Sequence, residues 1–495
     1  MEGESSSINI TSALSRIQFN SLEKWLYSEE TNQMSLRGVE LGEELRGREL
    51  LRLLLQAHIE CRGDGDVGAA IEVFKNDNRD ELTIYTHKRM HRRNIVTIFG
   101  EVCVKRMGYG MNGGASIHPL DERLQLPDRV YSYELQRRLV KRAIQGPFDE
   151  AIDALYEITG VRVPKRSAEE IVIDASMDFD SFYATRKSVG ECSSGPILVG
   201  SVDCKGIPMV KSELASKSVR RRKGQKAQKK RMATVAAVFT QRPYFRTPED
   251  VVASLFNLEE EGEKKRKKIH RPERKRVWAS LKSGKEVFIT DVYKEMNRRD
   301  PQCKKLRVVV TDGERALQRL VNSIMENIIL ILDFLHVLEK LWASGHALYG
   351  EGSSEAKKFV QERALRILNG GVSQVVKGMR QIVTKRELKG NKQKKLLEVA
   401  NYFYRNKTRM CYDDYLAQGL PIASGSVEGA CKNLIKDRME RSGMRWTARM
   451  AEGMVQMRAT YLSGDFDEYW DYHVTQEQER LYPKTRWKPR IAPSS

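Results

Sequence analysis

The spacing of apolar residues predicts helices over about the first 80 positions. Leucines recur at helical intervals through residues 49–59, which gives this helix one apolar face. Apolar and polar residues then alternate over 82–85 and again over 94–106, which predicts strands. We therefore expect a helical N-terminal region, 1–82, followed by a small β-ribbon unit, 83–126.

Helical spacing returns between residues 127 and 190. One helix is expected before a short turn at Gly160 and a second helix after it. Ser167 is a suitable N-cap for the second helix. Two helices joined by a glycine-containing turn are typical of a helix-turn-helix, in which Lys165 and Arg166 would face DNA phosphates. An ordinary helical hairpin has the same pattern, so both interpretations stay open here.

The middle of the chain, 191–343, alternates between apolar runs and helical patterns, as a mixed sheet with covering helices requires. The apolar runs predict strands at 196–203, 231–240, 306–312 and 328–333. Residues 344–420 are helical in pattern and rich in lysine, which predicts an inserted helical subdomain. Residues 421–470 return to the core, and residues 471–495 are expected to form a C-terminal tail.

Three of the four predicted strands end in aspartate, at Asp203, Asp312 and Asp333. A residue at the end of a strand emerges at the sheet edge, where a carboxylate is held in place and still open to water. Hard divalent cations such as Mg²⁺ bind carboxylate oxygens, and two ions about 4 Å apart can assist a displacement at phosphorus. These acids therefore predict a nuclease or strand-transfer site that holds two Mg²⁺ ions, for which Mn²⁺ can substitute.

Such a site normally needs a further acid, and Glu428 is the best candidate. Ser426 is a suitable N-cap, which would place Glu428 in the first turn of a helix and Lys432 and Lys436 on the same face, where we assign the two lysines to DNA binding. Alternatively, Glu428 only complements the helix dipole. The small polar residues around it favour a functional role.

The charge of the chain favours a polyanionic partner. Lys and Arg number 86 against 66 Asp and Glu, which gives a net charge of +20 and a pI of about 9.5. Residues 217–231 contain nine Lys or Arg and no acid, and 264–276 are also basic. Each stretch is either a solvated loop or a contact with the phosphate backbone. From the first stretch we assign these residues to DNA binding: Arg220, Arg221, Arg222, Lys223, Lys229, Lys230 and Arg231.

Several classes of protein are disfavoured by the sequence. The apolar runs are shorter than the roughly 20 residues that span a bilayer, and the N-terminus does not resemble a secretory signal, so we expect a cytoplasmic protein. The seven cysteines lack zinc-ligand spacing and are expected to be reduced thiols without zinc. Neither a phosphate-binding loop nor a dinucleotide-binding glycine motif occurs, so we expect no ATP and no nucleotide cofactor.

Several short motifs between about residues 90 and 470 carry a resemblance to a known family. They are Phe99-Gly-Glu-Val-Cys-Val, Gly146-Pro-Phe-Asp-Glu-Ala, Val202-Asp-Cys-Lys-Gly, Arg276-Val-Trp-Ala-Ser, Thr311-Asp-Gly, Asp333-Phe-Leu-His, Ala423-Ser-Gly-Ser-Val-Glu-Gly-Ala and Met439-Glu-Arg-Ser-Gly-Met-Arg-Trp. In these motifs the chain resembles bacterial insertion-sequence transposases of the ISKra type, within the DDE group that includes the mutator-like elements.

The resemblance implies a multidomain α+β protein. Its catalytic domain would be a ribonuclease-H-like mixed α/β fold with a helical insertion, preceded by helical and β-ribbon DNA-binding regions. Asp203, Asp312 and Glu428 would be the catalytic, metal-binding acids. The 116 residues between Asp312 and Glu428 are similar to the spacing in DDE enzymes with a helical insertion. A set of Asp203, Asp312 and Asp333 is the alternative.

Two further features each allow more than one role. The pair Asp333 and His336 resembles the Cys/Asp-x-x-His signature of mutator-like relatives, and His336 could orient a carboxylate, contact a nucleotide or simply pack. Arg445 and Trp446 would suit phosphate contact and stacking at a distorted DNA end, although tryptophan in a helical region is often a core residue.

The function expected from the resemblance is that of a DNA transposase. It would bind the terminal inverted repeats of its element, cleave phosphodiester bonds to expose 3′-hydroxyls, and join them to target DNA. We expect it to act on double-stranded DNA as a homodimer or larger assembly, associated with the bacterial nucleoid. The alternatives are a catalytically inactive DNA-binding protein derived from a transposase and a stand-alone ribonuclease-H-like nuclease.

Overall fold

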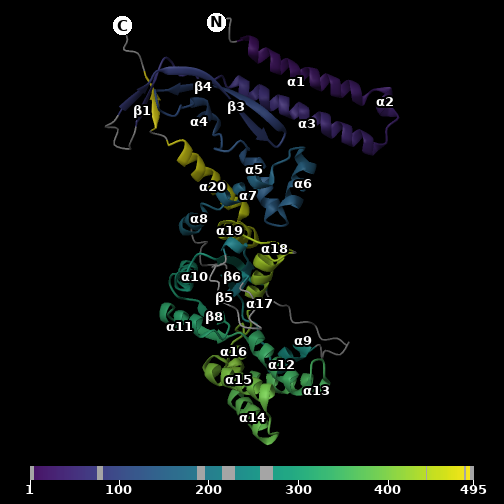
Figure 1. The fold of residues 1–495 in the computed structure, drawn as a ribbon, viewed down its shortest axis with the longest axis vertical. Helices are drawn as coiled ribbons and strands as arrows, with labels where there is room; N and C mark the ends of the chain where they lie inside the picture. Colours follow the sequence, from purple (N-terminus) through teal and green to yellow (C-terminus); the bar gives the residue numbers. More distant parts are fainter. Residues whose placement is uncertain are drawn as a thin grey trace. The chain divides into compact units, whose positions relative to one another are not determined.

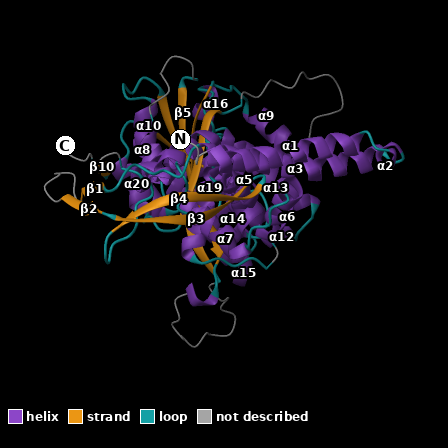
Figure 2. Ribbon diagram, turned by 90° about the horizontal axis from the view of Figure 1, so that it is seen from above, coloured by secondary structure: helices purple, strands orange, loops and turns teal. Residues whose placement is uncertain are grey.

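The computed structural model describes residues 5–74, 82–186, 195–213, 229–256, 271–441, 443–483 and 486–490, except for the side chains of 5–10 and 426–428 (Figure 1). The chain divides into two compact units, one formed by Met1–Ala184 with Asp467–Ser495 and the other by Thr185–Phe466. Helices predominate over strands (Figure 2), and the chain is a mixed α+β protein, as expected.

The first unit begins with a pair of long helices. Its helices, including two at its boundaries, are α1 (Ser5–Leu26), α2 (Glu29–Asn32), α3 (Leu36–Cys61), α4 (Pro119–Leu124), α5 (Tyr133–Ala143), α6 (Phe148–Thr159), α7 (Lys165–Ala175), α8 (Phe179–Thr185) and α20 (Phe466–Leu481). Helices α1 and α3 lie side by side (Figures 1 and 2). Gly42 of α3 leaves room for the indole of Trp25, and the guanidinium of Arg46 lies 4.0 Å from the centre of that ring.

The strands of the first unit form two small sheets. They are β1 (Ile71–Phe74), β2 (Leu82–Tyr85), β3 (His87–Thr97), β4 (Gly100–Gly110) and β10 (Trp487–Pro489). Strands β3 and β4 form an antiparallel ribbon that packs on α3 through buried residues such as Ile59, Ile95 and Val102. The other sheet has the order β10-β1-β2. Residues 471–495 were expected to form a tail but include most of α20 and the strand β10. Strand β10 forms because it supplies hydrogen-bond partners for the edge of β1.

Helices α5, α6 and α7 pack against one another. Gly160 ends α6 and adopts a φ of 68°. This φ lies in the left-handed region that favours glycine. Helix α7 begins at Lys165, directly after Pro164, whose φ of −59° is suited to the start of a helix. The expectation that Ser167 caps this helix is therefore wrong, since Ser167 lies inside its first turn.

The second unit is built around a five-stranded sheet. Its strands are β5 (Ile197–Pro208), β6 (Lys230–Gln241), β7 (Glu273–Ser280), β8 (Leu306–Thr311) and β9 (Ile329–Leu332), in the order β7-β6-β5-β8-β9. The neighbours β5, β6 and β7 are antiparallel, whereas β8 runs parallel to β5 and β9 runs parallel to β8. The four expected strands are present. Strand β7 was not expected as a strand because its first four residues are charged and only its last four are buried.

Helices cover the sheet and form most of the rest of this unit. They are α9 (Pro248–Phe256), α10 (Lys285–Arg299), α11 (Arg315–Ile324), α12 (Phe334–Tyr349), α13 (Ser354–Leu368), α14 (Val372–Lys385), α15 (Gly390–Asn406), α16 (Tyr412–Ala417), α17 (Gly425–Ala430), α18 (Asp437–Met439) and α19 (Ala448–Ser463), with the 3₁₀ turns η2 (Lys211–Glu213) and η3 (Lys407–Arg409) and the π-helical segment η4 (Cys431–Lys436). Helices α13 to α16 lie within the stretch expected to be helical. Within the described residues, no helix is both long and apolar enough to cross a bilayer.

Candidate active site

Three aspartates lie in a row at one edge of the five-stranded sheet. Val202 of β5 is paired with Thr311 of β8, and Thr311 is paired with Leu332 of β9. Asp203, Asp312 and Asp333 are the next residues along these three strands. Because the strands are parallel and in register, the three acids follow at the same edge.

Asp203 differs from the other two acids because it does not end its strand. Strand β5 continues to Pro208, since its antiparallel partner β6 extends beyond the point where pairing with β8 stops. The expectation of an aspartate at the strand end is therefore wrong for Asp203. Asp203 follows the last residue of β5 that pairs with β8. It therefore lies at the end of that pairing, beside Asp312.

The carboxylate of Asp203 is held by two donors. Its Oδ1 accepts a hydrogen bond of 2.6 Å from the backbone N–H of Cys204, and its Oδ2 accepts one of 3.3 Å from the Sγ of Cys431. Burial raises the pKa of the Cys431 thiol well above its ordinary value, and the charge of Asp203 raises it further. The thiol therefore stays protonated and can act as the donor.

Asp312 is a half-buried acid with both carboxylates and cations nearby. Its Oδ1 accepts a hydrogen bond of 3.0 Å from the backbone N–H of Glu314. Burial raises the pKa of Asp312; the hydrogen bond from Glu314 N–H and the charge of His336 oppose this increase, and the carboxylates of Asp203 and Glu314 add to it. A cation bound between Asp203 and Asp312 would relieve this repulsion.

Cationic and phenolic side chains surround this pair of acids. Lys285, the first residue of α10, donates a hydrogen bond of 2.7 Å to Glu314 Oε2. Tyr402 reaches the site from α15, and burial together with the charge of Asp312 raises the pKa of Tyr402 to about 12. A Cβ atom at Gly313 would collide with the Tyr402 hydroxyl, so glycine is needed there for α15 to approach. The helical stretch thus contributes one wall of the site.

Asp333 is fully buried and has four hydrogen-bond partners. Its Oδ1 accepts bonds from the backbone N–H groups of Leu335, at 2.9 Å, and Ser424, at 3.3 Å. Its Oδ2 accepts bonds from the Ser424 hydroxyl and from Nδ1 of His336, the latter at 3.2 Å. Asp333 therefore caps α12 and holds Ser424, which leaves it less available to a metal than Asp203 or Asp312.

His336 provides a positive charge beside the acids. The hydrogen bond to Asp333 raises the pKa of His336 to about 9, against the opposing effect of burial. The imidazole is therefore protonated at neutral pH, and its charge also interacts with Asp203 and Asp312. Among the roles considered for His336, this geometry favours orienting and neutralising carboxylates.

Glu428 lies in helix α17, and its side chain is outside the described residues. The helix packs against β5 and β6. It begins at Gly425, so Ser426 is not the N-cap that was expected. The preceding residue, Ser424, bonds to Asp333 instead, and Cys431 directly after the helix bonds to Asp203. Both ends of the helix that carries Glu428 are thus tied to the row of aspartates.

No group of three or more His, Cys, Asp or Glu side chains is placed to hold a metal ion among the side chains described, which do not include that of Glu428. Among the described aspartates of the row, Asp203 and Asp312 have the carboxylate oxygens that are less occupied by hydrogen bonds than those of Asp333. These oxygens are the ligand type that Mg²⁺ prefers.

The residues assigned to DNA binding lie in several places. Lys229, Lys230, Arg231, Lys432, Lys436 and Arg445 are exposed, and Arg220, Arg221, Arg222 and Lys223 lie outside the described residues. Lys165 and Arg166 are exposed on α7 and form surface ion pairs with Asp149, at 2.8 Å, and Glu170, at 3.3 Å. Such pairs contribute little to stability, so phosphates could replace these acids as partners.

Trp446 is a core residue, and its assignment to base stacking is therefore corrected. The residue is only 5% exposed, and its Nε1 donates a hydrogen bond of 2.9 Å to the carbonyl oxygen of Met439. The guanidinium of Arg438 lies 4.9 Å from the centre of its ring. Packing on this ring leaves it closed to a nucleotide, whereas the neighbouring Arg445 points to solvent.

Four residues at the site were not singled out from the sequence: Lys285, Tyr402, Ser424 and Cys431. Ser424 and Cys431 flank the segment around Glu428, and their polar side chains at its two ends were the only available signal. Nothing local marks Lys285 or Tyr402, because their place depends on how α10 and α15 pack.

Comparisons with known proteins find only a distant structural likeness to this chain. No protein family model and no curated protein matches the chain. Five chains of solved structures match, among them one from the Drosophila P element transposase strand transfer complex, at 11% sequence identity and a TM-score of 0.24. That match covers 72% of this chain and 82% of the other. The likeness is distant, so the function has to be inferred from the chain's own residues.

Proposed function

We propose that this protein is a DDE transposase, resembling the insertion-sequence transposases of the ISKra type. The proposal is carried by one observation: the register of β5 and β8 brings Asp203 and Asp312 side by side, while α17 with Glu428 packs on β5. Three acids from distant parts of the chain would then meet at one sheet edge.

The sheet itself supports a ribonuclease-H-like catalytic domain. The order β7-β6-β5-β8-β9 combines three antiparallel neighbours with two parallel additions, and the first acid stands in the central strand. Helices α13 to α16 lie between the second acid and the third, in the position of the expected insertion.

Two Mg²⁺ ions are the proposed cofactors, and the donor set fits them. Asp203 and Asp312 offer carboxylate oxygens; burial raises the pKa of Asp312 and the charge of Asp203 adds to it, and a divalent cation between the two acids would favour their ionised forms. Glu428 would complete the ligands. When bound, such ions polarise the reacting phosphate and lower the pKa of the attacking hydroxyl or water.

The remaining residues of the site would attract the phosphate and hold the helix that bears Glu428. Protonated His336 adds a positive charge on the side of Asp333, which favours the approach of a phosphate. The contacts of Ser424 and Cys431 fix the helix that bears Glu428.

The proposed reaction has two steps at phosphorus. Water first attacks the phosphodiester at the end of the element, which breaks the bond to the 3′-oxygen and leaves a 3′-hydroxyl. That hydroxyl then attacks a phosphate of the target, forms the new bond and releases a 3′-hydroxyl on the target strand.

Exposed apolar side chains on α1 and α3 support assembly on DNA as a homodimer or larger oligomer. Ile17, Leu36 and Leu45 are exposed by 62%, 75% and 70%. Apolar groups concentrated on one helical pair are typical of surfaces that associate.

The test is metal-dependent cleavage by the full chain of a labelled duplex with the inverted repeats that flank the coding region. We expect release of 3′-hydroxyls and joining to a target duplex with Mg²⁺ or Mn²⁺, little chemistry with Ca²⁺, and no product from Asp312→Asn. Specific binding without cleavage would instead indicate an inactive DNA-binding protein. Cleavage without joining or preference for the repeats would indicate a stand-alone nuclease.

A further inference from the structure

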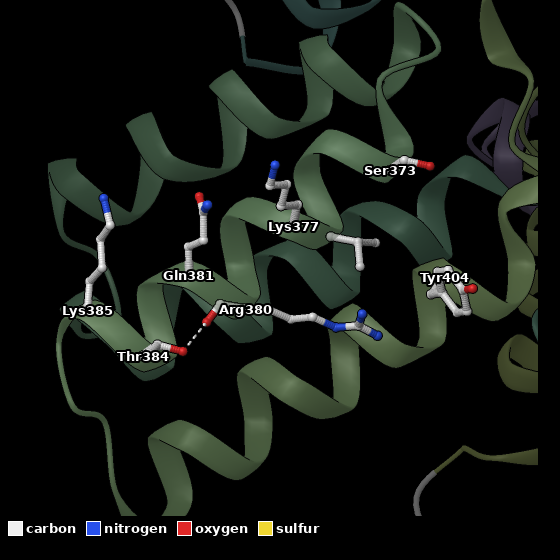
Figure 3. Close-up of a pocket in the computed structure, with 8 residues that line it drawn as sticks. Ser373, Lys377, Arg380, Gln381, Thr384, Lys385 and Tyr404 are labelled. Atoms are coloured by element: carbon white, nitrogen blue, oxygen red, sulfur yellow. Dashed lines mark hydrogen bonds between the residues drawn. The ribbon is translucent and has the colours of Figure 1, made fainter.

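A basic groove runs along α14, away from the row of aspartates in the sequence. It has a volume of about 460 Å³, and these residues line it: Ser373, Val376, Lys377, Arg380, Gln381, Thr384, Lys385 and Tyr404 (Figure 3). Figure 3 shows Lys377, Gln381 and Lys385 extending from the same side of α14, with Arg380 extending toward Tyr404 of α15. All but Val376 are exposed, so the groove is open to a large partner.

The groove belongs to a helical part of the chain with a large excess of positive charge. Residues 372–409 contain eleven Lys or Arg and two Glu, a difference of nine positive charges, and α14 itself contains no acid. In the described part of the chain, no carboxylate lies within 4 Å of the charged atoms of Lys377, Arg380 or Lys385. By contrast, Arg129 and Arg137 of the first unit are each paired with two acids. Within the described residues, the cations of the groove thus lack a carboxylate that would compete with a bound anion.

The other lining groups are those that proteins use to contact phosphate and sugar. Ser373, Gln381, Thr384 and Tyr404 each carry a side-chain donor, and such side chains supply most backbone contacts to DNA together with Lys and Arg. Arg380 is already positioned, because its Nη2 donates a hydrogen bond of 3.0 Å to Asn401 Oδ1. Its guanidinium lies 5.4 Å from the centre of the Tyr404 ring, and Lys407 Nζ lies 5.3 Å from the same ring.

The dimensions also suit a duplex. Lys377 and Lys385 are eight residues apart, which corresponds to about 12 Å along a helix. Successive phosphates on one strand rise by about 3.4 Å along the DNA axis, so these cations span roughly three to four base pairs. A small-molecule pocket would be more enclosed.

We propose that this groove binds the phosphate backbone of double-stranded DNA without regard to sequence. The proposal deepens the transposase function and rests on it for the source of the DNA. It adds a contact from α14 and α15 to those assigned from the sequence, none of which lies on these two helices.

The experiment compares two triple variants of the full chain in binding to a random-sequence duplex, without divalent cations, between 50 and 200 mM salt. The first is Lys377→Gln/Arg380→Gln/Lys385→Gln. The control, Lys357→Gln/Lys358→Gln/Lys392→Gln, removes the same charge from exposed positions on α13 and α15 outside the groove. Each phosphate contact contributes about 0.9 to the slope of log K against log salt. We expect the groove variant to lose roughly two to three units of slope and the control to lose less than one, with equal melting temperatures.

The outcomes separate the groove from the transposase function. Equal slopes for the groove variant and the control would overturn the proposal that the groove binds DNA, even if the wild-type protein cleaves its repeats. Loss of slope in the groove variant of a protein that shows no metal-dependent cleavage would support the groove and overturn the enzyme. Failure of the wild-type chain to bind any duplex would overturn both.

Discussion

The Sγ of Cys431 lies 3.3 Å from Oδ2 of Asp203, although the two residues are 228 positions apart in the sequence. This contact ties the end of α17 to the central strand of the sheet. At the other end, Ser424 bonds to Asp333. Glu428 lies between the two contacts, so its helix is held at both ends beside the row of aspartates.

The first prediction concerns Glu428. Glu428→Gln keeps the size of the side chain and removes its charge and one anionic oxygen, so folding and binding to the repeats should survive. Cleavage and strand transfer should fall by roughly 100-fold or more, because electrostatic stabilisation at the reacting phosphate is usually the largest catalytic contribution. The measurement is the rate of 3′-hydroxyl release with Mg²⁺.

Glu339→Gln is the matched control for this variant. Glu339 is exposed on α12, three residues after His336, and its replacement should change the rate little. Near-normal cleavage by Glu428→Gln would show that Glu428 is not the third acid. The alternative set of Asp203, Asp312 and Asp333 would then be favoured.

The second prediction concerns Ser424 as a positioning residue. Ser424→Ala deletes the hydroxyl that donates to the buried carboxylate of Asp333, which should lower the free energy of unfolding by about 1–3 kcal/mol. Because the start of α17 is then less restrained, kcat for cleavage should fall while binding of the repeats is retained. Denaturant unfolding and single-turnover cleavage measure the two effects.

Ser424→Thr keeps the hydroxyl and should recover most of the lost rate. If the Ala and Thr variants cleave equally fast, the hydroxyl does not position the helix. A loss of stability without a change in kcat would reduce Ser424 to a structural residue.

The third prediction is a pH dependence of stability that arises in the first unit. Nε2 of His118 lies 2.8 Å from Nδ1 of His91, and burial together with the charge of Arg106 lowers the pKa of His118 to about 4. Between pH 6.5 and 4 the unfolded chain binds a proton at this position that the folded chain does not. The free energy of unfolding should therefore decrease as the pH falls through this range.

His118→Gln should weaken this dependence, and the difference between the wild-type and variant proteins isolates it from other titrating groups. Urea unfolding midpoints at several pH values from 7 to 4 would show it. Parallel curves for the two proteins would mean that His118 titrates normally.

The fourth prediction tests the surface of α1 and α3. Leu36→Gln/Leu45→Gln removes two of the most exposed apolar side chains of this pair, so the stability of the fold should change little. The mass measured by light scattering should fall from that of an oligomer to that of one chain. Leu82→Gln/Leu306→Gln, at exposed apolar positions elsewhere, should leave the mass unchanged, and an equal shift in both variants would argue against this surface.

Much of the local structure follows from the sequence pattern alone. Apolar runs indicate β5, β6, β8 and β9, most clearly where the strand is buried on both faces; eight consecutive residues of β6, Ala233–Thr240, are buried. An aspartate directly after such a run is also readable, as for Asp312 and Asp333. The excess of basic residues is a property of composition and needs no fold.

Which of these residues meet depends on how the elements pack and pair. Sequence patterns report burial along one element, whereas the place of Asp203 beside Asp312 depends on the pairing of Val202 with Thr311. The same limit explains the burial of Trp446, which rests on packing by Arg438. The groove on α14 likewise requires Tyr404 from a different helix, and no local pattern records that α14 and α15 pack together.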